Sequence, residues 1–234
     1  MTASALIGRQ REVQVLTDLL GNASAAGRSV VLIGDPGIGK SALLGAAAEQ
    51  ARRSGFRVLA AAGVQSEAQL PFAGLHQLLR PVLVSADRLP PAHGDALLSA
   101  FGLSGGPQPD LFLIALAAES LLAAVAADRP VAVLADDVQW LDPQTQAVLT
   151  FMARRAGPHP VVIIGAVRTG HPGSYVAAGL PELELHGVDD AAAEEILRLH
   201  AGALGPADRH RIQREAQGNP LALLELPAAW PVPR

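Results

Sequence analysis

Cysteine is absent from this 234-residue sequence. Its absence excludes disulfides, a thiolate nucleophile and thiolate metal ligands. The seven histidines are scattered and form no H-E-x-x-H or comparable cluster, so the sequence predicts no histidine metal centre. Aromatic residues make up only 3% of the chain and hydrophobic residues 50%, so the core must be built from Ala, Val, Leu and Ile.

An excess of positive charge is also missing. The net charge is −4, so this segment by itself is not expected to bind nucleic acid. No signal peptide is expected, because Arg9 and Arg11 interrupt the N-terminal region before an apolar stretch develops. The apolar residues 111–127 are rich in Ala and contain Glu119, which favours a buried helix over a membrane span. We therefore expect a cytoplasmic protein with no membrane-spanning segment.

Lysine is nearly absent too, and its one occurrence is informative. Of the 18 Lys and Arg residues, only Lys40 is a lysine, and it lies in the segment GDPGIGKS, which fits the phosphate-loop pattern G-x-x-x-x-G-K-[ST]. Residues 29–33 before it are typical of a buried strand, and residues 41–53 after it predict a helix. Backbone N–H groups at such a junction bind phosphate oxygens, and a slim ammonium group can reach between them. The segment therefore predicts a di- or triphosphate site.

Two adjacent carboxylates, Asp136 and Asp137, follow the apolar residues 131–135. Ligands of open parallel sheets lie at the carboxyl ends of the strands, so we expect one carboxylate to face a metal ion and the other the γ-phosphate. Arg168 ends a second apolar run, residues 160–167, and a cation at that edge can sense phosphate charge. The alternatives are solvated turn carboxylates and an ordinary surface arginine.

The remaining pattern predicts an α/β protein. Strands are expected at residues 56–62 and 181–185, a helical insertion at residues 71–127, and a helix capped by Asp142. Composition then shifts to helices, and Pro227 is expected to end regular structure. We predict a three-layer P-loop NTPase fold, with a parallel sheet and helices on both faces, over residues 1–186. A partial helical lid would follow over residues 187–234.

Six segments occur in an order that resembles a known family. They are LIGRQREV, GDPGIGKSALL, PFAGLHQLLRPV, VLADDVQWLDP, AVRT and GNPLALLEL. Together they resemble the N-terminal ATPase module of large LuxR-family transcriptional regulators, which belong to the signal-transducing STAND branch of AAA-like P-loop ATPases (the ASCE class). The phosphate loop alone indicates only a nucleotide; the ordered set is far more specific.

The resemblance implies a role for each matching position. Lys40 would bind the β- and γ-phosphates, Asp137 would polarise the attacking water, and Arg168 matches a sensor arginine. Ser41 would bind Mg²⁺ directly, and Asp136 would hold it through water. Residues 7–9 would lie against the nucleotide base, and Pro220 would touch adenine from the lid. The residues that would contact ATP or ADP are Ile7, Gly8, Arg9, Gly34, Asp35, Pro36, Gly37, Ile38, Gly39, Lys40, Ser41, Ala42 and Pro220.

The sequence departs from the family pattern at two places. Gln10 stands where the family usually has Glu after the entry-motif Arg, so a role for that carboxylate is not expected. The chain also stops inside or just after the lid, so the C-terminal effector and DNA-binding regions of such regulators are expected to be absent from it. DNA would then be a partner only through a region outside this chain.

The function that these patterns favour is Mg-ATP binding with slow hydrolysis, acting as a nucleotide switch in transcription regulation. An inducer or regulatory protein and nucleotide-dependent self-association are expected as further partners. Two alternatives stay open: a P-loop metabolic kinase, whose acceptor pocket the inserted helices would line, and a non-hydrolysing scaffold that keeps ATP as a structural ligand. A GTPase is excluded, because its Asn/Thr-Lys-x-Asp base reader needs a second lysine.

Overall fold

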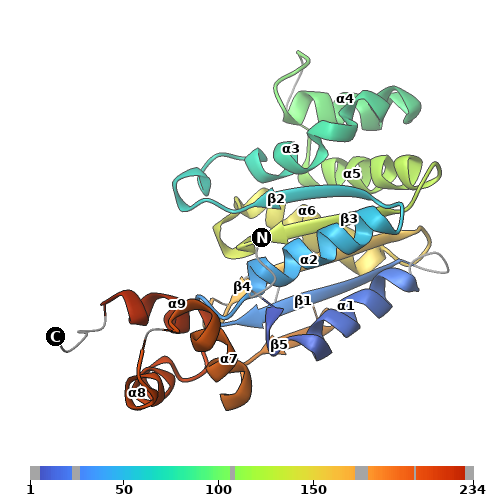
Figure 1. Ribbon diagram of the computed structural model, residues 1–234. Coiled ribbons are helices and arrows are strands. Elements are labelled where there is room, and N and C mark those ends of the chain that lie inside the picture. Colours follow the sequence, from blue (N-terminus) through green and yellow to red (C-terminus); the bar gives the residue numbers. More distant parts are fainter. Residues whose placement is uncertain (1–5, 23–26, 106–108, 172–178, 203, 230–234) are drawn as a thin grey trace.

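The computed structural model describes residues 6–22, 27–105, 109–171, 179–202 and 204–229. Its centre is a five-stranded sheet in the order β2-β3-β4-β1-β5, in which neighbouring strands are parallel (Figure 1). The strands are β1 (Arg28–Gly34), β2 (Arg57–Ala62), β3 (Val131–Asp136), β4 (Val161–Arg168) and β5 (Glu182–Leu185). The predicted parallel α/β sheet is confirmed.

The register of the sheet decides which residues meet at its carboxyl edge. Gly34 at the end of β1 pairs with Arg168 at the end of β4, and Ala62 of β2 pairs with Asp136 of β3. Strand β4 lies between β1 and β3, so the phosphate loop after β1 and the two aspartates at the end of β3 flank Arg168. The predicted site residues of three strands are thereby brought to one edge.

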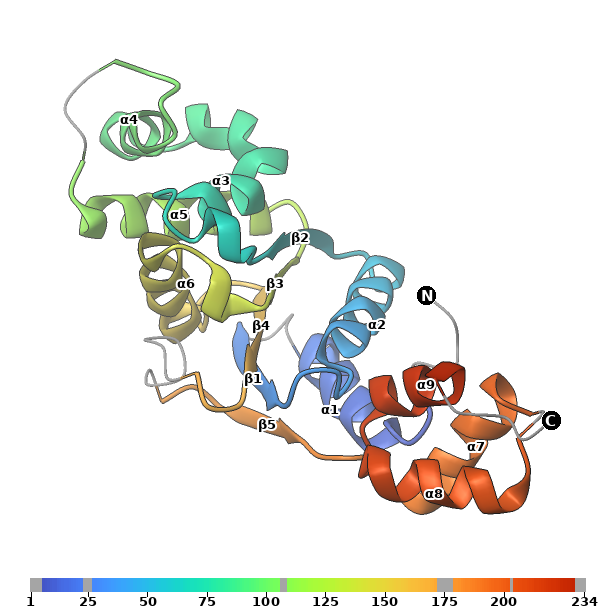
Figure 2. The same ribbon diagram turned by 90° about the vertical axis from the view of Figure 1, so that its left-hand side faces the viewer.

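Helices cover both faces of the sheet (Figures 1 and 2). One face carries α1 (Gln10–Gly21) and α2 (Lys40–Arg53). The other face carries α3 (Ala73–Leu79), α4 (Pro91–Ala100), α5 (Leu111–Ala126) and α6 (Pro143–Arg155), together with the 3-10 helices η2 (Gln65–Glu67), η3 (Arg80–Arg88) and η4 (Val138–Trp140). The three-layer arrangement agrees with the predicted fold class.

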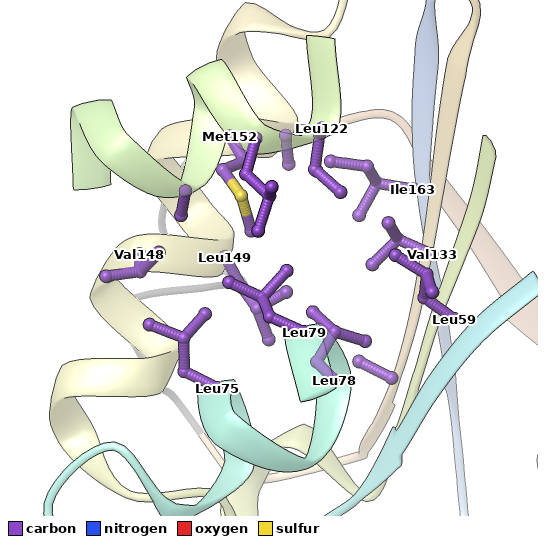
Figure 3. Close-up of a cluster of buried hydrophobic side chains, with 14 of the residues drawn as sticks. Leu59, Leu75, Leu78, Leu79, Leu122, Val133, Val148, Leu149, Met152 and Ile163 are labelled. Atoms are coloured by element: carbon purple, nitrogen blue, oxygen red, sulfur yellow. The ribbon is translucent and has the colours of Figure 1, made fainter. Parts of the chain in front are cut away.

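Strand residues alternate between two cores, as a period of two requires. Val133 packs on the side of α3, α5 and α6, whereas Ala132 and Leu134 pack on the side of α2. Figure 3 shows the first core, where leucines of α3 and α6 meet the strand side chains of Val133 and Ile163. Burying each such side chain stabilises the fold by about 1.5–3 kcal/mol relative to its exposure. Aliphatic residues alone thus make a large core with few aromatics.

The inserted region between β2 and β3 is helical, as expected, but it is divided. Helix α3 ends at Leu79 and is followed by η3, which has Pro81 near its start, a residue that cannot continue an α-helix. Asp110 caps the apolar helix α5, because its carboxylate accepts a hydrogen bond from the Leu113 N–H, and the helix buries eight of its side chains. No helix in the described part of the chain is long and apolar enough to cross a bilayer.

Three C-terminal helices form a small bundle beside the carboxyl edge of the sheet (Figure 2). They are α7 (Asp190–His200), α8 (Pro206–Ala216) and α9 (Pro220–Ala229). One expectation was wrong: Pro227 does not end regular structure but lies inside α9. Leu223 of α9 is fully buried in the bundle core, with Leu226 packed against it, and this packing outweighs the hydrogen bond that Pro227 cannot donate.

Candidate functional site

The phosphate loop joins β1 to α2 with two glycines in the left-handed region. Gly37 has a φ of 78° and Gly39 a φ of 105°, conformations that side chains with a Cβ rarely adopt. Lys40 begins α2 and is only 6% exposed. Its Nζ donates to the carbonyl oxygens of Gly34 at 2.8 Å and Asp35 at 2.9 Å. Burial lowers the pKa of Lys40 below its usual value, although nearby carboxylates, Asp137 above all, oppose the shift.

A pocket with a volume of about 240 Å³ lies over this loop. Its walls come from the loop, from the ends of β3 and β4, and from the first turn of α9. The lining residues are Pro36, Gly37, Gly39, Lys40, Ser41, Ala42, Asp137, Arg168, Pro220, Leu221 and Leu224. Apart from Leu221 and Leu224, these residues were predicted as site residues, and the structure brings them together from distant parts of the sequence.

Asp137 and Arg168 form an ion pair in this pocket. Arg168 Nε donates to Asp137 Oδ1 at 3.1 Å, and Arg168 Nη2 donates to Oδ2 at 3.2 Å. Burial alone would raise the pKa of the Asp137 carboxyl, but hydrogen bonds from Arg168 and Gln139 outweigh it, so this pKa lies below its usual value. The same bond to Asp137 raises the pKa of Arg168. Both groups are therefore fully charged at neutral pH.

The backbone at Asp137 is unusual for a residue with a side chain. Its φ of 44° and ψ of 49° lie in the left-handed region. Such a conformation costs about 1–3 kcal/mol outside glycine and is concentrated at functional sites. It turns the chain sharply between β3 and η4, so that the carboxylate of Asp137 faces Lys40 and Arg168.

Asp136 lies beside a different space. Its Oδ1 accepts a hydrogen bond from the Asp137 N–H at 2.9 Å, and it lines a second cavity of about 250 Å³ between α2, α3 and the ends of β2 and β3. Gln77 of α3 lines the same cavity. The two neighbouring aspartates thus lie beside different cavities. Among the described residues no cluster of three or more His, Cys, Asp or Glu could hold a metal ion.

The predicted base-contacting segment, residues 7–9, lies outside the lining of the 240 Å³ pocket. Arg9 is 3% exposed, and its Nη2 donates to the Ile38 carbonyl oxygen at 2.9 Å and to the His186 carbonyl oxygen at 2.6 Å. A Cβ on Gly8 would lie 2.7 Å from the Cβ of Ala192 in α7. This segment therefore ties the phosphate loop to the start of the C-terminal bundle.

The C-terminal bundle also contacts the phosphate loop directly. Asn219 Nδ2 donates to the Pro36 carbonyl oxygen, and the Leu221 N–H donates to the Gly37 carbonyl oxygen. Pro220, the predicted adenine-contacting residue, lies between these two and faces the pocket with Leu224. The pocket is consequently closed on one side by the bundle.

Sequence reasoning missed four residues of this site. Gln139 bonds to Asp137, Asn219 bonds to the loop, and two leucines, Leu221 and Leu224, extend the apolar wall beside Pro220. All four lie within or beside segments that the sequence singled out, VLADDVQWLDP and GNPLALLEL. Polar side chains next to a motif were therefore the signal that could have found Gln139 and Asn219.

Comparison with known families gives one match over most of the chain. Residues 5–164 match the AAA ATPase domain family. Among proteins with curated annotation, none matches this sequence significantly.

Solved structures of similar fold share little sequence with this chain. A Walker-type ATPase of Pyrococcus abyssi has a TM-score of 0.58 and 16% identity, with 94% of this chain and 66% of that chain covered. DnaA from Aquifex aeolicus, bound to AMPPCP, has a TM-score of 0.51 and 17% identity, with 92% and 58% covered. A STAND protein with a tetratricopeptide repeat sensor from Pyrococcus horikoshii has a TM-score of 0.53 and 20% identity, with 93% and 29% covered. The chain thus spans less than two thirds of the length of these three proteins.

Proposed function

Because the chain belongs to the AAA ATPase domain family, we propose that its pocket binds ATP and ADP with Mg²⁺ and hydrolyses ATP slowly. The observation that carries the proposal is the convergence of Lys40, Asp137 and Arg168 on one pocket from three separate elements. A buried lysine at a helix N-terminus favours an anionic ligand, because the N–H groups and the ammonium group add their positive charge. Residues 34–42 would cradle the phosphates.

The other wall of the pocket suits the base. Pro220, Leu221 and Leu224 present an apolar surface opposite the loop. A purine has two apolar faces that such side chains can cover, and burying them contributes to binding. We also propose that residues 7–9 form part of the base site. They contact both the phosphate loop and the C-terminal bundle, which line the pocket.

We propose that Mg²⁺, which prefers oxygen ligands and keeps several waters, binds at the carboxyl edge of the sheet. The Ser41 hydroxyl would bind the ion directly and the Asp136 carboxylate through water. When bound, Mg²⁺ neutralises phosphate charge. Asp137 stays ionised at neutral pH and can orient a water for attack.

The pairing of Arg168 with Asp137 offers a physical reason for slow turnover. A guanidinium that is already bonded to a carboxylate must leave it before it can stabilise phosphate charge. A missing arginine finger lowers the rate of comparable enzymes by about 10³–10⁵. Low turnover suits a switch, because each nucleotide state then lasts long enough for a partner to bind it.

We place the division between the ATPase core and a partial helical lid at residues 186 and 187. A nucleotide bound between Lys40 and Pro220 would bridge the two and bias their closure. The proposed role is a cytoplasmic STAND-type switch of a LuxR-family transcriptional regulator, set by an inducer or regulatory protein. DNA would be bound by a region outside this chain, and self-association would depend on the nucleotide.

One observation favours a second candidate, a small-molecule kinase. The 250 Å³ cavity beside Asp136 is lined by Gln77 of the inserted helices and is large enough for a small acceptor. A kinase would produce ADP faster when its acceptor is present. Screening small alcohols and acids for accelerated ADP production tests this candidate. If none of them raises the rate above that of hydrolysis by water, the result would count against it.

The test of the main proposal compares three proteins in calorimetry and in a single-turnover hydrolysis assay. Wild type should bind ATP and ADP in the presence of Mg²⁺ and hydrolyse ATP. Lys40→Ala should lose nucleotide affinity, whereas Asp137→Asn should keep it and lose turnover. Equal turnover in wild type and Asp137→Asn would refute the role of Asp137, and binding without turnover in wild type would favour the scaffold alternative. Failure of wild type to bind either nucleotide would refute the proposal.

A further inference from the structure

We propose that Gln139 is a positioning residue that holds the Asp137 carboxylate in place for hydrolysis, an inference that rests on the proposed ATPase function. Gln139 lies on η4, two residues after Asp137, and no motif or resemblance assigns it a role. Its Nε2 donates to Asp137 Oδ1 at 2.7 Å. Its Oε1 accepts a hydrogen bond from the backbone N–H of Arg168 at 3.2 Å. One side chain therefore links the end of β3 to the end of β4.

The chemistry of the two partners calls for an amide at position 139. The Asp137 carboxylate only accepts hydrogen bonds, and the Arg168 N–H only donates one. A glutamine side chain can donate to the first and accept from the second at the same time. A carboxylate, a hydrocarbon or an ammonium group at this position would leave at least one of the two partners without its bond.

The bond from Gln139 is distinct from the ion pair in one respect. Arg168 holds Asp137 through its flexible side chain, whereas Gln139 is fastened to the main chain of β4, which pairs with both β1 and β3. When the Arg168 guanidinium turns to phosphate, Asp137 loses two hydrogen bonds but keeps the one from Gln139. The carboxylate would then stay aimed at the position of the attacking water.

The local backbone does not by itself hold the Asp137 carboxylate in one position. Asp137 has the left-handed conformation described above, and the strand ends at the residue before it. The Trp140 N–H donates to the Asp137 carbonyl oxygen at 2.8 Å, which fixes the turn but not the carboxylate. The described contacts leave the side chain of Asp137 with only Gln139 and Arg168 as hydrogen-bond donors.

The test uses two substitutions at position 139 in the full chain. Gln139→Met keeps the length of the side chain but removes both bonds, and Gln139→Glu keeps an acceptor for the Arg168 N–H but removes the donor to Asp137. If the donor is what matters, the single-turnover rate with bound ATP should fall about tenfold to a hundredfold in both variants, as misplaced catalytic groups commonly cause. KM and the Kd for ATP should stay within about threefold of wild type, because Gln139 does not line the nucleotide pocket.

A matched control is provided by Gln146 of α6. Its Nε2 donates to the Leu141 carbonyl oxygen at 2.8 Å, so this glutamine side chain also binds the backbone just after η4. It has no hydrogen bond to Asp137 or Arg168 among the described contacts. Gln146→Met should keep the wild-type rate. Thermal unfolding of all variants detects any loss of the fold.

The possible outcomes separate this inference from the proposed function. Wild-type turnover in Gln139→Met would overturn the inference and leave the ATPase proposal standing. A rate retained in Gln139→Glu but lost in Gln139→Met would also overturn it, since the Arg168 N–H bond alone would then matter. Parallel losses of rate, ATP affinity and thermal stability in both variants would show a purely structural role. Absence of turnover in wild type would refute both proposals together.

Discussion

Asn219 of the C-terminal bundle donates from Nδ2 to the carbonyl oxygen of Pro36 in the phosphate loop, at 2.9 Å and across 183 residues of sequence. The other end of the same amide caps α9, because its Oδ1 accepts from the N–H groups of Leu221 at 3.0 Å and Ala222 at 3.3 Å. The helix start and the loop are therefore held by one side chain. A movement of the loop backbone on binding phosphate would therefore move the start of α9 through Asn219.

The two roles of Asn219 can be separated by substitution. Serine keeps an oxygen for the helix cap but cannot reach Pro36, whereas alanine loses both. We expect Asn219→Ser to weaken binding of ATP and ADP about fivefold in calorimetry, the equivalent of one hydrogen bond worth about 1 kcal/mol. Asn219→Ala should weaken binding to a similar degree and also lower the free energy of unfolding by about 1 kcal/mol, since the cap is lost. Unchanged affinity in Asn219→Ser would mean that the bond from Asn219 to Pro36 takes no part in nucleotide binding.

The two left-handed glycines of the loop give a second, matched pair of variants. A Cβ on Gly37 would lie 2.7 Å from the Leu221 Cβ and 2.9 Å from Asn219 Oδ1, whereas a Cβ on Gly39 would meet nothing within 4 Å. Both alanine variants should lower the free energy of unfolding by about 1–2 kcal/mol through backbone strain. Only Gly37→Ala should also push α9 off the loop.

Hydrogen exchange at the amides of α9 measures this difference. In Gly37→Ala the Leu221 N–H should exchange much faster than in wild type, because its acceptor is the Gly37 carbonyl oxygen. In Gly39→Ala the exchange of α9 should resemble wild type. Equal protection of α9 in both variants would contradict a direct contact between loop and bundle.

Asp142 predicts a stability effect away from the pocket. It is 2% exposed, and its carboxylate accepts from the N–H groups of Phe72 at 2.9 Å, Gly74 at 3.2 Å and Thr145 at 2.9 Å. We expect Asp142→Ala to lower the free energy of unfolding by about 3 kcal/mol or more, because three buried N–H groups lose their acceptor at about 1–3 kcal/mol each. Urea denaturation measures the change.

The matched control is Asp189, which caps α7 through one bond to the Ala192 N–H at 2.8 Å. Asp189→Ala should cost only about 1 kcal/mol, the usual value for one cap. A similar loss in both variants would mean that the bonds from Asp142 to the inserted helices contribute nothing.

Asp142 also illustrates what the sequence could predict and what it could not. The pair Asp142-Pro143 is a local signal, and the helix start that it predicted is present in α6. The bonds to Phe72 and Gly74 are not local, since they join segments about 70 residues apart and depend on how α3 packs against α6. The same contrast applies to Pro227, where a local rule predicted a helix end and packing of Leu223 prevailed.

Within the pocket, the sequence could predict the residues that lie at the carboxyl ends of the strands. Arg168 ends strand β4, Asp137 directly follows β3, and Lys40 follows β1 through the phosphate loop, so parallel pairing brings all three to one edge. The ion pair between Asp137 and Arg168 depends on a left-handed turn at a non-glycine residue, for which the sequence carries no signal. Contacts of α9 with the loop depend on the orientation of the bundle, which hydrophobic spacing does not specify.

The only lysine of the chain allows a clean test of pH dependence. Burial lowers the pKa of Lys40 in the folded protein below the ordinary value for lysine. Between the folded and unfolded pKa values the unfolded chain binds more protons, so the contribution of Lys40 to the free energy of unfolding rises with pH in that window. The unfolding free energy of wild type minus that of Lys40→Met should therefore increase as the pH rises toward the unfolded pKa of lysine, and level off above it.

Urea denaturation at several pH values, with no nucleotide present, measures this difference. All other titratable groups are common to both proteins, so their contributions to the difference cancel. Arg53→Met in the last turn of α2 is the control: a guanidinium stays protonated throughout the window, and its difference from wild type should stay flat. A difference for Lys40→Met that is flat or falls with pH would contradict a buried, charged Lys40 beneath the pocket.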